Sequence, residues 1–339
     1  MLMQEESPAG SLARRRRATR RAHVRAVAAV AVVAVLAVSG AVSYAVRPGI
    51  IETSDDADGP LRVVTTTTFL NDTVRRIGGE HVRTVRLMGP GVDPHLYQAR
   101  ASDLRQMRAA DAVFAVGLYL EGSLMRTLHG LAREKPVLFV GEAIPEDRLL
   151  APPAGSAPEE EHDPHVWFDP RLWAHVVDAV TARLAELDPA HADDYRRAGG
   201  DYRERVLTLA EEAEAALATI PPRSRVLVTS HDAFRYLGAA FGMDVVAVQG
   251  ISTQEEAGTA DVTRVADAVV DSGVRSVFLE TSVPGRTLDA VLAAVRQRGG
   301  EVRLGQPLYS DSAGDDGTPE GTYLGMVRAN IDRIVEGLR

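Results

Sequence analysis

Short apolar runs alternate along most of the chain with segments whose apolar residues recur at helical spacing. Runs typical of buried strands lie at residues 61–68, 82–88, 111–116 and 136–140, and again at 225–229, 244–248, 275–279 and 301–304. Helical spacing fills the segments between them, for example at 71–77, 104–110 and 262–272. This alternation predicts an α/β fold with two parallel-sheet lobes, each covered by helices on both faces.

The two sets of strands are separated by a region without strand signals. Residues 171–187 predict one helix, and residues 190–220, which end at Pro221-Pro222, predict one long connecting helix. Gly199-Gly200 in its middle predicts a kink or a break between two helices. We therefore expect an N-terminal α/β lobe at 61–187, a connecting helix at 188–220 and a C-terminal α/β lobe at 221–339, with a cleft between the lobes.

The N-terminus has the pattern of an export segment. Seven arginines lie within residues 1–25, and residues 26–46 are uncharged and dominated by alanine and valine. A helix of that length is about 30 Å long, enough to cross a bilayer, and its basic flank should stay cytoplasmic. We interpret residues 1–48 as a basic N-terminus with a signal or anchor helix, and 49–60 as an acidic linker. Small residues at 39–45 leave cleavage open; we favour a retained anchor that holds the protein at the outer face of the cytoplasmic membrane.

Charge and cysteine content narrow the function. The chain has a net charge of −9, and since residues 1–25 contribute +5 (seven arginines against two glutamates), the remainder carries −14. An acidic exported domain argues against nucleic acid and favours cations. The absence of cysteine excludes disulfides, thiolate metal sites and a lipid attached through cysteine. We expect a monomer.

Histidines follow several of the predicted strands. His95 and His165 each end an Asp-Pro-His sequence, which proline makes a rigid turn; His231 directly follows the strand at 225–229, and Asp311 follows the last strand region. Ligands of open α/β sheets bind beyond the carboxyl ends of the strands, so these four side chains can converge on the interlobe cleft. Three imidazoles and a carboxylate suit Zn²⁺ and are compatible with Mn²⁺. We therefore predict a metal site formed by His95, His165, His231 and Asp311.

Other carboxylates lie close to these positions in the sequence. Asp93, Asp163 and Asp232 are candidates for orienting the imidazoles. Glu280 ends the strand at 275–279, and we interpret it as a helix cap. The alternatives are a carboxylate beside a metal ligand, or the fourth ligand itself.

From residue 61 to the C-terminus the chain resembles the zinc- and manganese-binding solute-binding proteins of bacterial ABC importers. The resemblance rests on eight segments in family order: 63–67, 78–80, 93–95, 117–121, 163–167, 230–234, 250–253 and 308–312. It implies two α/β lobes joined by one long rigid helix, with metal ligands at His95, His165, His231 and Asp311. Manganese-selective members often have glutamate where this chain has His231, which favours zinc. The implied function is extracytoplasmic capture of a divalent metal ion and its delivery to the transmembrane subunit of an ABC permease, without catalysis.

Three other functions compete with this interpretation. A zinc metallohydrolase needs an open coordination position and a nearby base; Glu280 could serve as one, but the chain has no His-Glu-x-x-His sequence. A surface adhesion protein would hold a structural metal that chelators remove only on unfolding. A siderophore or haem binder would leave the four convergent ligands without a role.

Overall fold

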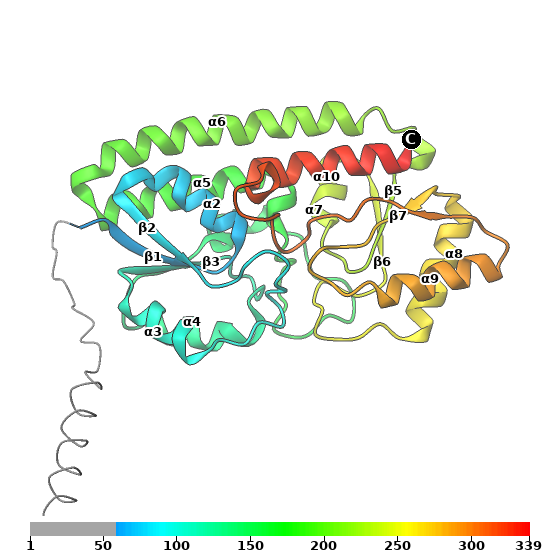
Figure 1. The fold of residues 1–339 in the computed structure, drawn as a ribbon, viewed down its shortest axis with the longest axis horizontal. Helices are drawn as coiled ribbons and strands as arrows, with labels where there is room; N and C mark the ends of the chain where they lie inside the picture. The colour runs from blue at the N-terminus through cyan, green and yellow to red at the C-terminus, as the bar shows by residue number, and fades with distance from the viewer. Residues whose placement is uncertain (1–58) are drawn as a thin grey trace, which may run out of the picture. The chain divides into compact units, whose positions relative to one another are not determined.

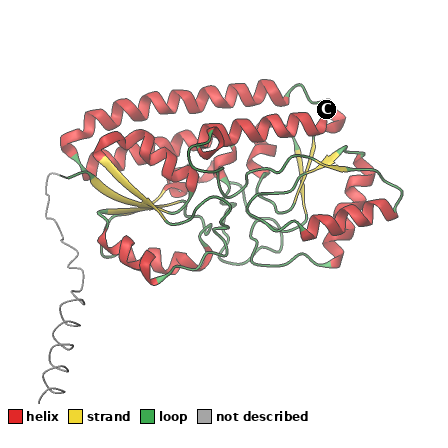
Figure 2. Ribbon diagram, in the orientation of Figure 1, coloured by secondary structure: helices red, strands yellow, loops and turns green. Residues whose placement is uncertain are grey.

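A four-stranded parallel sheet forms the N-terminal lobe (Figures 1 and 2). Its order is β2 (Val82–Arg86), β1 (Leu61–Thr65), β3 (Ala112–Ala115) and β4 (Val137–Phe139). All four residues of β3 are buried, as expected of an inner strand covered on both faces. Helices α2 (Thr68–Gly78) and α5 (Pro170–Leu187) lie on one face, and α3 (Ala101–Ala109) and α4 (Met125–Leu131) lie on the other.

The C-terminal lobe contains two parallel strand pairs. Strand β5 (Val226–Thr229) pairs with β6 (Asp244–Ala247), and β7 (Ser276–Val277) pairs with β8 (Arg303–Leu304). The pairs adjoin where Phe278 N donates to Val228 O at 2.9 Å. The surrounding helices are α7 (Arg235–Phe241), α8 (Thr259–Ser272), α9 (Arg286–Gln297) and α10 (Tyr323–Leu338). Strands β7 and β8 are shorter than predicted, because beyond Val277 the backbone leaves regular pairing and retains only a single bridge between Glu280 and Leu308.

The computed structural model describes residues 59–339. The predicted basic N-terminus, the apolar helix at 26–46 and nearly all of the acidic linker lie outside the described residues. Among residues 59–339, every helix is too short or too polar to cross a membrane.

Helices α5 and α6 (Ala192–Leu217) follow one another along the chain between the strands of the two lobes. Asp169 caps α5 by accepting a hydrogen bond from Arg171 N at 2.9 Å, and Pro170 takes the first helical position, where its missing N–H costs nothing. Helix α6 then runs along both lobes (Figure 1), and one continuous apolar core joins N-terminal residues such as Phe69 to C-terminal residues such as Phe278. The predicted two-lobe α/β fold is confirmed. The lobe boundaries at 61–187, 188–220 and 221–339 stay a prediction.

The predicted kink or break at Gly199-Gly200 is wrong, because α6 is continuous from Ala192 to Leu217 and runs without a sharp bend (Figure 1). Gly199 is buried where α6 packs against α5, and a β-carbon there would lie 2.1 Å from Thr181 Oγ1. Gly200 is exposed, and a β-carbon there would have no neighbour within 4 Å. The first glycine therefore allows close helix packing.

This difference gives opposite expectations for two adjacent substitutions. Gly200→Ala should raise the free energy of unfolding by about 1 kcal/mol, the helix preference of alanine over glycine. Gly199→Ala should lower it by about 1–3 kcal/mol, because the added methyl overlaps Thr181. Denaturant unfolding of both variants measures the two changes, and equal effects would contradict this packing.

Candidate metal centre

Both Asp-Pro-His sequences fold into the same turn. The Asp93 carboxylate accepts the backbone N–H of His95 at 2.8 Å, and the Asp163 carboxylate accepts that of His165 at 3.0 Å. An aspartate that bonds the backbone two residues on fixes the chain without helix or strand. Both imidazoles are thereby presented from loops beyond the carboxyl ends of strands in the N-terminal lobe.

The structure brings all four predicted ligands together. One nitrogen from each of His95, His165 and His231 and one oxygen of Asp311 lie within 4.8 Å of one another, and all four residues are buried. His231 Nε2 lies 3.3 Å from Asp311 Oδ2, and His165 Nε2 lies 3.6 Å from Asp311 Oδ1. Ligand atoms about 2.0–2.2 Å from a tetrahedral ion are separated by about 3.3–3.6 Å. The spacing of His165, His231 and Asp311 therefore fits one metal ion, and His95 Nε2 lies slightly farther out, 4.0 Å from Asp311 Oδ2.

The unsatisfied atoms of the site point to the same conclusion. The Nε2 atoms of the three histidines and both carboxylate oxygens of Asp311 are buried without a hydrogen-bond partner. Buried polar atoms are normally paired, and a group of them facing one point marks the position of an ion.

Two further carboxylates orient the imidazoles. Asp163 Oδ1 lies 2.7 Å from His165 Nδ1, and Glu280 Oε2 forms a short contact with His231 Nδ1 while Oε1 accepts the backbone N–H of His231 at 2.8 Å. A carboxylate on Nδ1 fixes the proton there and leaves the Nε2 lone pair for a metal. The interpretation of Glu280 as a helix cap is therefore wrong. Its position directly after a strand, the same signal that indicated His231, could have revealed it.

The other two candidate aspartates have different partners. Asp93 contacts the backbone of His95 rather than its ring, and its second oxygen accepts a hydrogen bond from Thr253 Oγ1 at 2.5 Å. Asp232 pairs with Arg235 at 3.7 Å. Burial and the nearby Asp163 carboxylate raise the pKa of Asp232 to about 6, despite that guanidinium.

The pKa shifts differ among the predicted ligands. Burial lowers the pKa of His95 to about 3. Burial acts in the same direction on His231, but the Glu280 and Asp311 carboxylates outweigh it and raise the pKa of His231 well above its usual value. Burial alone would raise the pKa of Asp311, yet the imidazoles, His231 first, hold it below its ordinary range. Asp311 is thus ionised, and His231 retains a proton that a metal must displace.

Arg235 completes the charges of the site, and no pattern in the sequence indicated it. Its Nη1 donates to Asp163 Oδ2 at 3.2 Å. Asp163, Glu280 and Asp311 are buried carboxylates, so once a metal has displaced the proton of His231 this single guanidinium leaves two negative charges around the neutral imidazoles. A divalent cation balances them.

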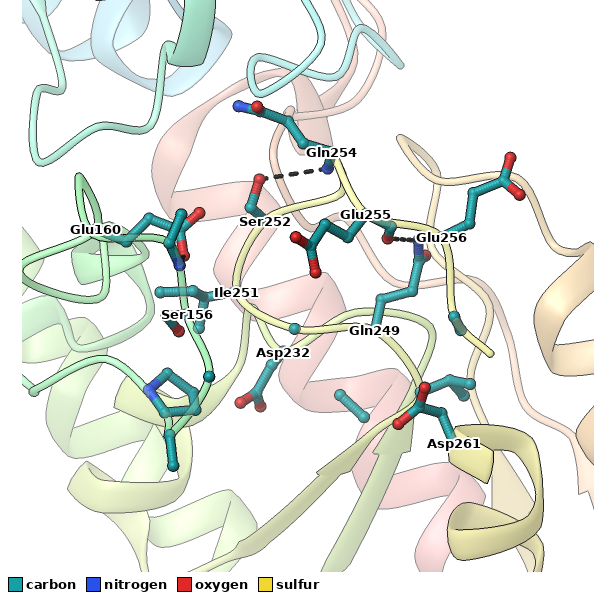
Figure 3. Close-up of a pocket in the computed structure, with 18 of the residues that line it drawn as sticks. Ser156, Glu160, Asp232, Gln249, Ile251, Ser252, Gln254, Glu255, Glu256 and Asp261 are labelled. Carbon is teal, nitrogen blue, oxygen red and sulfur yellow. Dashed lines mark hydrogen bonds between the residues drawn. The ribbon is translucent and has the colours of Figure 1, made fainter. Parts of the chain in front are cut away.

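A pocket of about 650 Å³ borders the site through Asp232, the residue after His231 (Figure 3). Its lining includes six acidic side chains and one cationic side chain, Arg264; the acidic residues are Glu159, Glu160, Asp232, Glu255, Glu256 and Asp261. Acidic clefts concentrate cations near their walls.

Two α/β lobes around a buried site of three imidazoles and a carboxylate define a metal-binding protein. Residues 63–337 match the family model for the zinc-uptake complex component A, periplasmic, and the chain belongs to this family of metal-binding substrate-binding proteins of ABC importers.

Curated relatives and solved structures agree with this family. The chain is 41% identical over 283 residues to the manganese-binding lipoprotein MntA of Bacillus subtilis, covering 84% of this chain and 91% of that protein. It is 39% identical over 282 residues to the zinc-binding protein TroA of Treponema pallidum, covering 83% and 90%. The solved structure of the periplasmic zinc-binding protein TroA superposes with a TM-score of 0.79, covering 83% of this chain and 99% of that one.

Family membership confirms several predictions from the sequence. The family consists of non-enzymatic transport proteins that bind divalent metals for ABC importers, which excludes the metallohydrolase interpretation. Relatives are periplasmic proteins and lipoproteins, in agreement with an extracytoplasmic location.

Proposed function

We propose that this protein captures Zn²⁺ outside the cytoplasmic membrane and delivers it to an ABC permease, with His95, His165, His231 and Asp311 as the metal ligands. The observation that carries the proposal is the convergence of their unpartnered buried atoms within a spacing that fits one ion. No enzymatic step is involved. The metal is the transported substrate, and the permease is its acceptor.

Zinc is favoured over manganese by the ligand types. Imidazole suits zinc, and zinc binds nitrogen and oxygen sites more tightly than manganese does. Manganese prefers more oxygen ligands and often retains water, whereas this site is buried and offers only the two oxygens of Asp311. Manganese remains the second candidate, because each oxygen of Asp311 faces a different imidazole and the two could bind one ion together. The 41% identical relative is also named for manganese.

Metal content tests this proposal. The full chain, purified without added metal, should contain one zinc per chain that chelators remove while the protein stays folded, and competitive titration should rank Zn²⁺ above Mn²⁺. One retained manganese, or equal retention of both, would shift the function to a broader divalent importer. A metal that leaves only on unfolding would favour the adhesion protein with a structural metal.

We further propose that residues 26–46 retain the protein at the outer face of the membrane. Relatives are named as lipoproteins, but this chain has no cysteine to carry a lipid. An uncharged segment of 21 residues can replace the lipid as an anchor. We expect the protein to be extracted only by detergent and to retain residues 1–25. A mature protein that begins after residue 40 and washes off the membrane would contradict the anchor.

Metal affinity should fall as the pH is lowered, starting in the neutral range. The metal binds the unprotonated Nε2 of His231, and the raised pKa of His231 means that this atom carries a proton at neutral pH. His95, whose pKa is lowered to about 3, does not compete above about pH 4. Calorimetry in buffers of different ionisation enthalpy should show release of about one proton per metal at pH 7. Zero release would contradict the protonation of His231 at pH 7, and an affinity that is flat from pH 7.5 to 5.5 would contradict imidazole ligation.

A further inference from the structure

His95 is the least restrained of the three imidazoles. His165 and His231 each have a carboxylate on Nδ1, whereas among residues 59–339 no hydrogen bond reaches the Nδ1 of His95. The position of the His95 ring therefore depends on how its backbone is held. The next residue, Leu96, is 53% exposed, so this turn lies at the protein surface.

The backbone of His95 is held partly by the opposite lobe. Its N–H is bound by Asp93 Oδ1, and Asp93 Oδ2 in turn accepts the hydroxyl proton of Thr253, which lies between β6 and α8. Its carbonyl accepts a bond from Gln254 Nε2 at 3.4 Å. The carbonyl also packs against Gly122, where a β-carbon would lie only 2.4 Å away.

The two Asp-Pro-His turns share this bridging arrangement. In each, one aspartate oxygen binds the N–H of the ligand histidine and the other binds a side chain of the C-terminal lobe: Thr253 for Asp93 and Arg235 for Asp163. The bridges differ in burial. Asp163 is fully buried and Tyr236 Oη donates to its carbonyl at 2.9 Å, whereas Asp93 is only partly buried. The Asp93 bridge is therefore the one that can open without exposing the core.

The segment that carries Thr253 also has space to move. Residues 249–252 and 254–257 line the 650 Å³ pocket, and Figure 3 shows Gln254 at its edge with its side chain turned away from Asp232. Thr253 itself is 8% exposed and faces Asp93 instead. A segment with an open pocket on one side moves with little loss of packing.

We propose that Thr253 is a positioning residue for metal release: through Asp93 it makes the position of His95 depend on contact between the two lobes. When the lobes are in contact, His95 stays on the ion. When the Thr253–Asp93 bond opens, His95 leaves first, and the ion remains on three ligands from which it dissociates faster. This inference rests on the proposed metal-capture function.

Thr253→Val removes the hydroxyl at nearly constant volume and leaves Asp93 and all four ligands in place. In the Zn²⁺-loaded full chain, the transfer of metal to a chelator, monitored by stopped flow, should become about tenfold faster. This factor corresponds to the loss of one hydrogen bond to a charged group. The association rate should change less than about twofold, because the ion meets the same ligands. Thr253→Ser keeps the hydroxyl and should release metal at the parental rate.

Two comparisons separate positioning from a general loss of stability. Thr259→Val changes an exposed hydroxyl at the start of α8 that has no hydrogen bond among the described residues, and it should leave release unchanged. In an Asp93→Asn background, Thr253→Val should add much less than it does alone, because the two residues share one bond. If the parent holds zinc and Thr253→Val releases it at the same rate as the parent, the role of Thr253 is overturned and the metal function stays intact. A parent that holds no metal would overturn the proposed function and this inference with it.

Discussion

Replacing His165 by alanine is expected to lower the affinity for Zn²⁺ by about 100- to 1000-fold. Four-ligand zinc sites bind with about 10–16 kcal/mol, so one ligand in four contributes roughly 2.5–4 kcal/mol, which corresponds to that factor. His165 should matter most among the three histidines because its ring lies nearest to both others, whose own centroids are 5.9 Å apart. Its ring centroid is 5.5 Å from that of His95 and 5.3 Å from that of His231, and its Nε2 faces Asp311 Oδ1 at 3.6 Å. Competition titration against a chelator of known affinity measures the loss.

The control must exclude damage to the fold. His165 is fully buried beside Trp167, so alanine leaves a void; His165→Gln fills more of it without providing an imidazole. Both variants should lose affinity, and the metal-free glutamine variant should unfold close to the parent. His129→Ala removes an exposed imidazole from α4 and should bind zinc normally. Parental affinity in His165→Ala would remove this residue from the site.

The sequence was sufficient for the fold class because each lobe follows from local patterns. Apolar runs give the strands, and parallel pairing places the ends of β2, β4 and β5 where His95, His165 and His231 can meet. The ends of the elements were less predictable. Strand β7 stops at Val277 because its continuation carries Glu280 towards His231, a contact that depends on tertiary packing and leaves no periodic signal.

Contacts between the lobes were beyond reach of the sequence for the same reason. Arg235 is the first residue of a helix, and Thr253 lies in a loop. Both become part of the site only because the lobes face each other. At Gly199 the sequence pattern suggested the wrong role for the residue. Glycine in a helix predicts weakness, and only the position of Thr181 on the neighbouring helix shows that the glycine permits close packing.

Glu280→Gln is expected to lower zinc affinity by about 10- to 100-fold, although Glu280 is not among the proposed ligands. Glutamine offers one acceptor where Glu280 accepts two bonds, from the backbone N–H and the ring of His231, so one donor is left facing an amide N–H. The loss of negative charge also makes His231 a weaker base and a weaker ligand.

The proton count distinguishes this mechanism from simple loosening of the site. Glu280 is the strongest of the influences that raise the pKa of His231, so its neutralisation should lower that pKa and reduce proton release at pH 7 below one per metal. Calorimetry in two buffers measures affinity and proton release on the same sample. Glu255→Gln, which neutralises an exposed carboxylate of the adjacent pocket, should change neither. If Glu280→Gln loses affinity but still releases one proton, Glu280 holds His231 in place without setting its basicity.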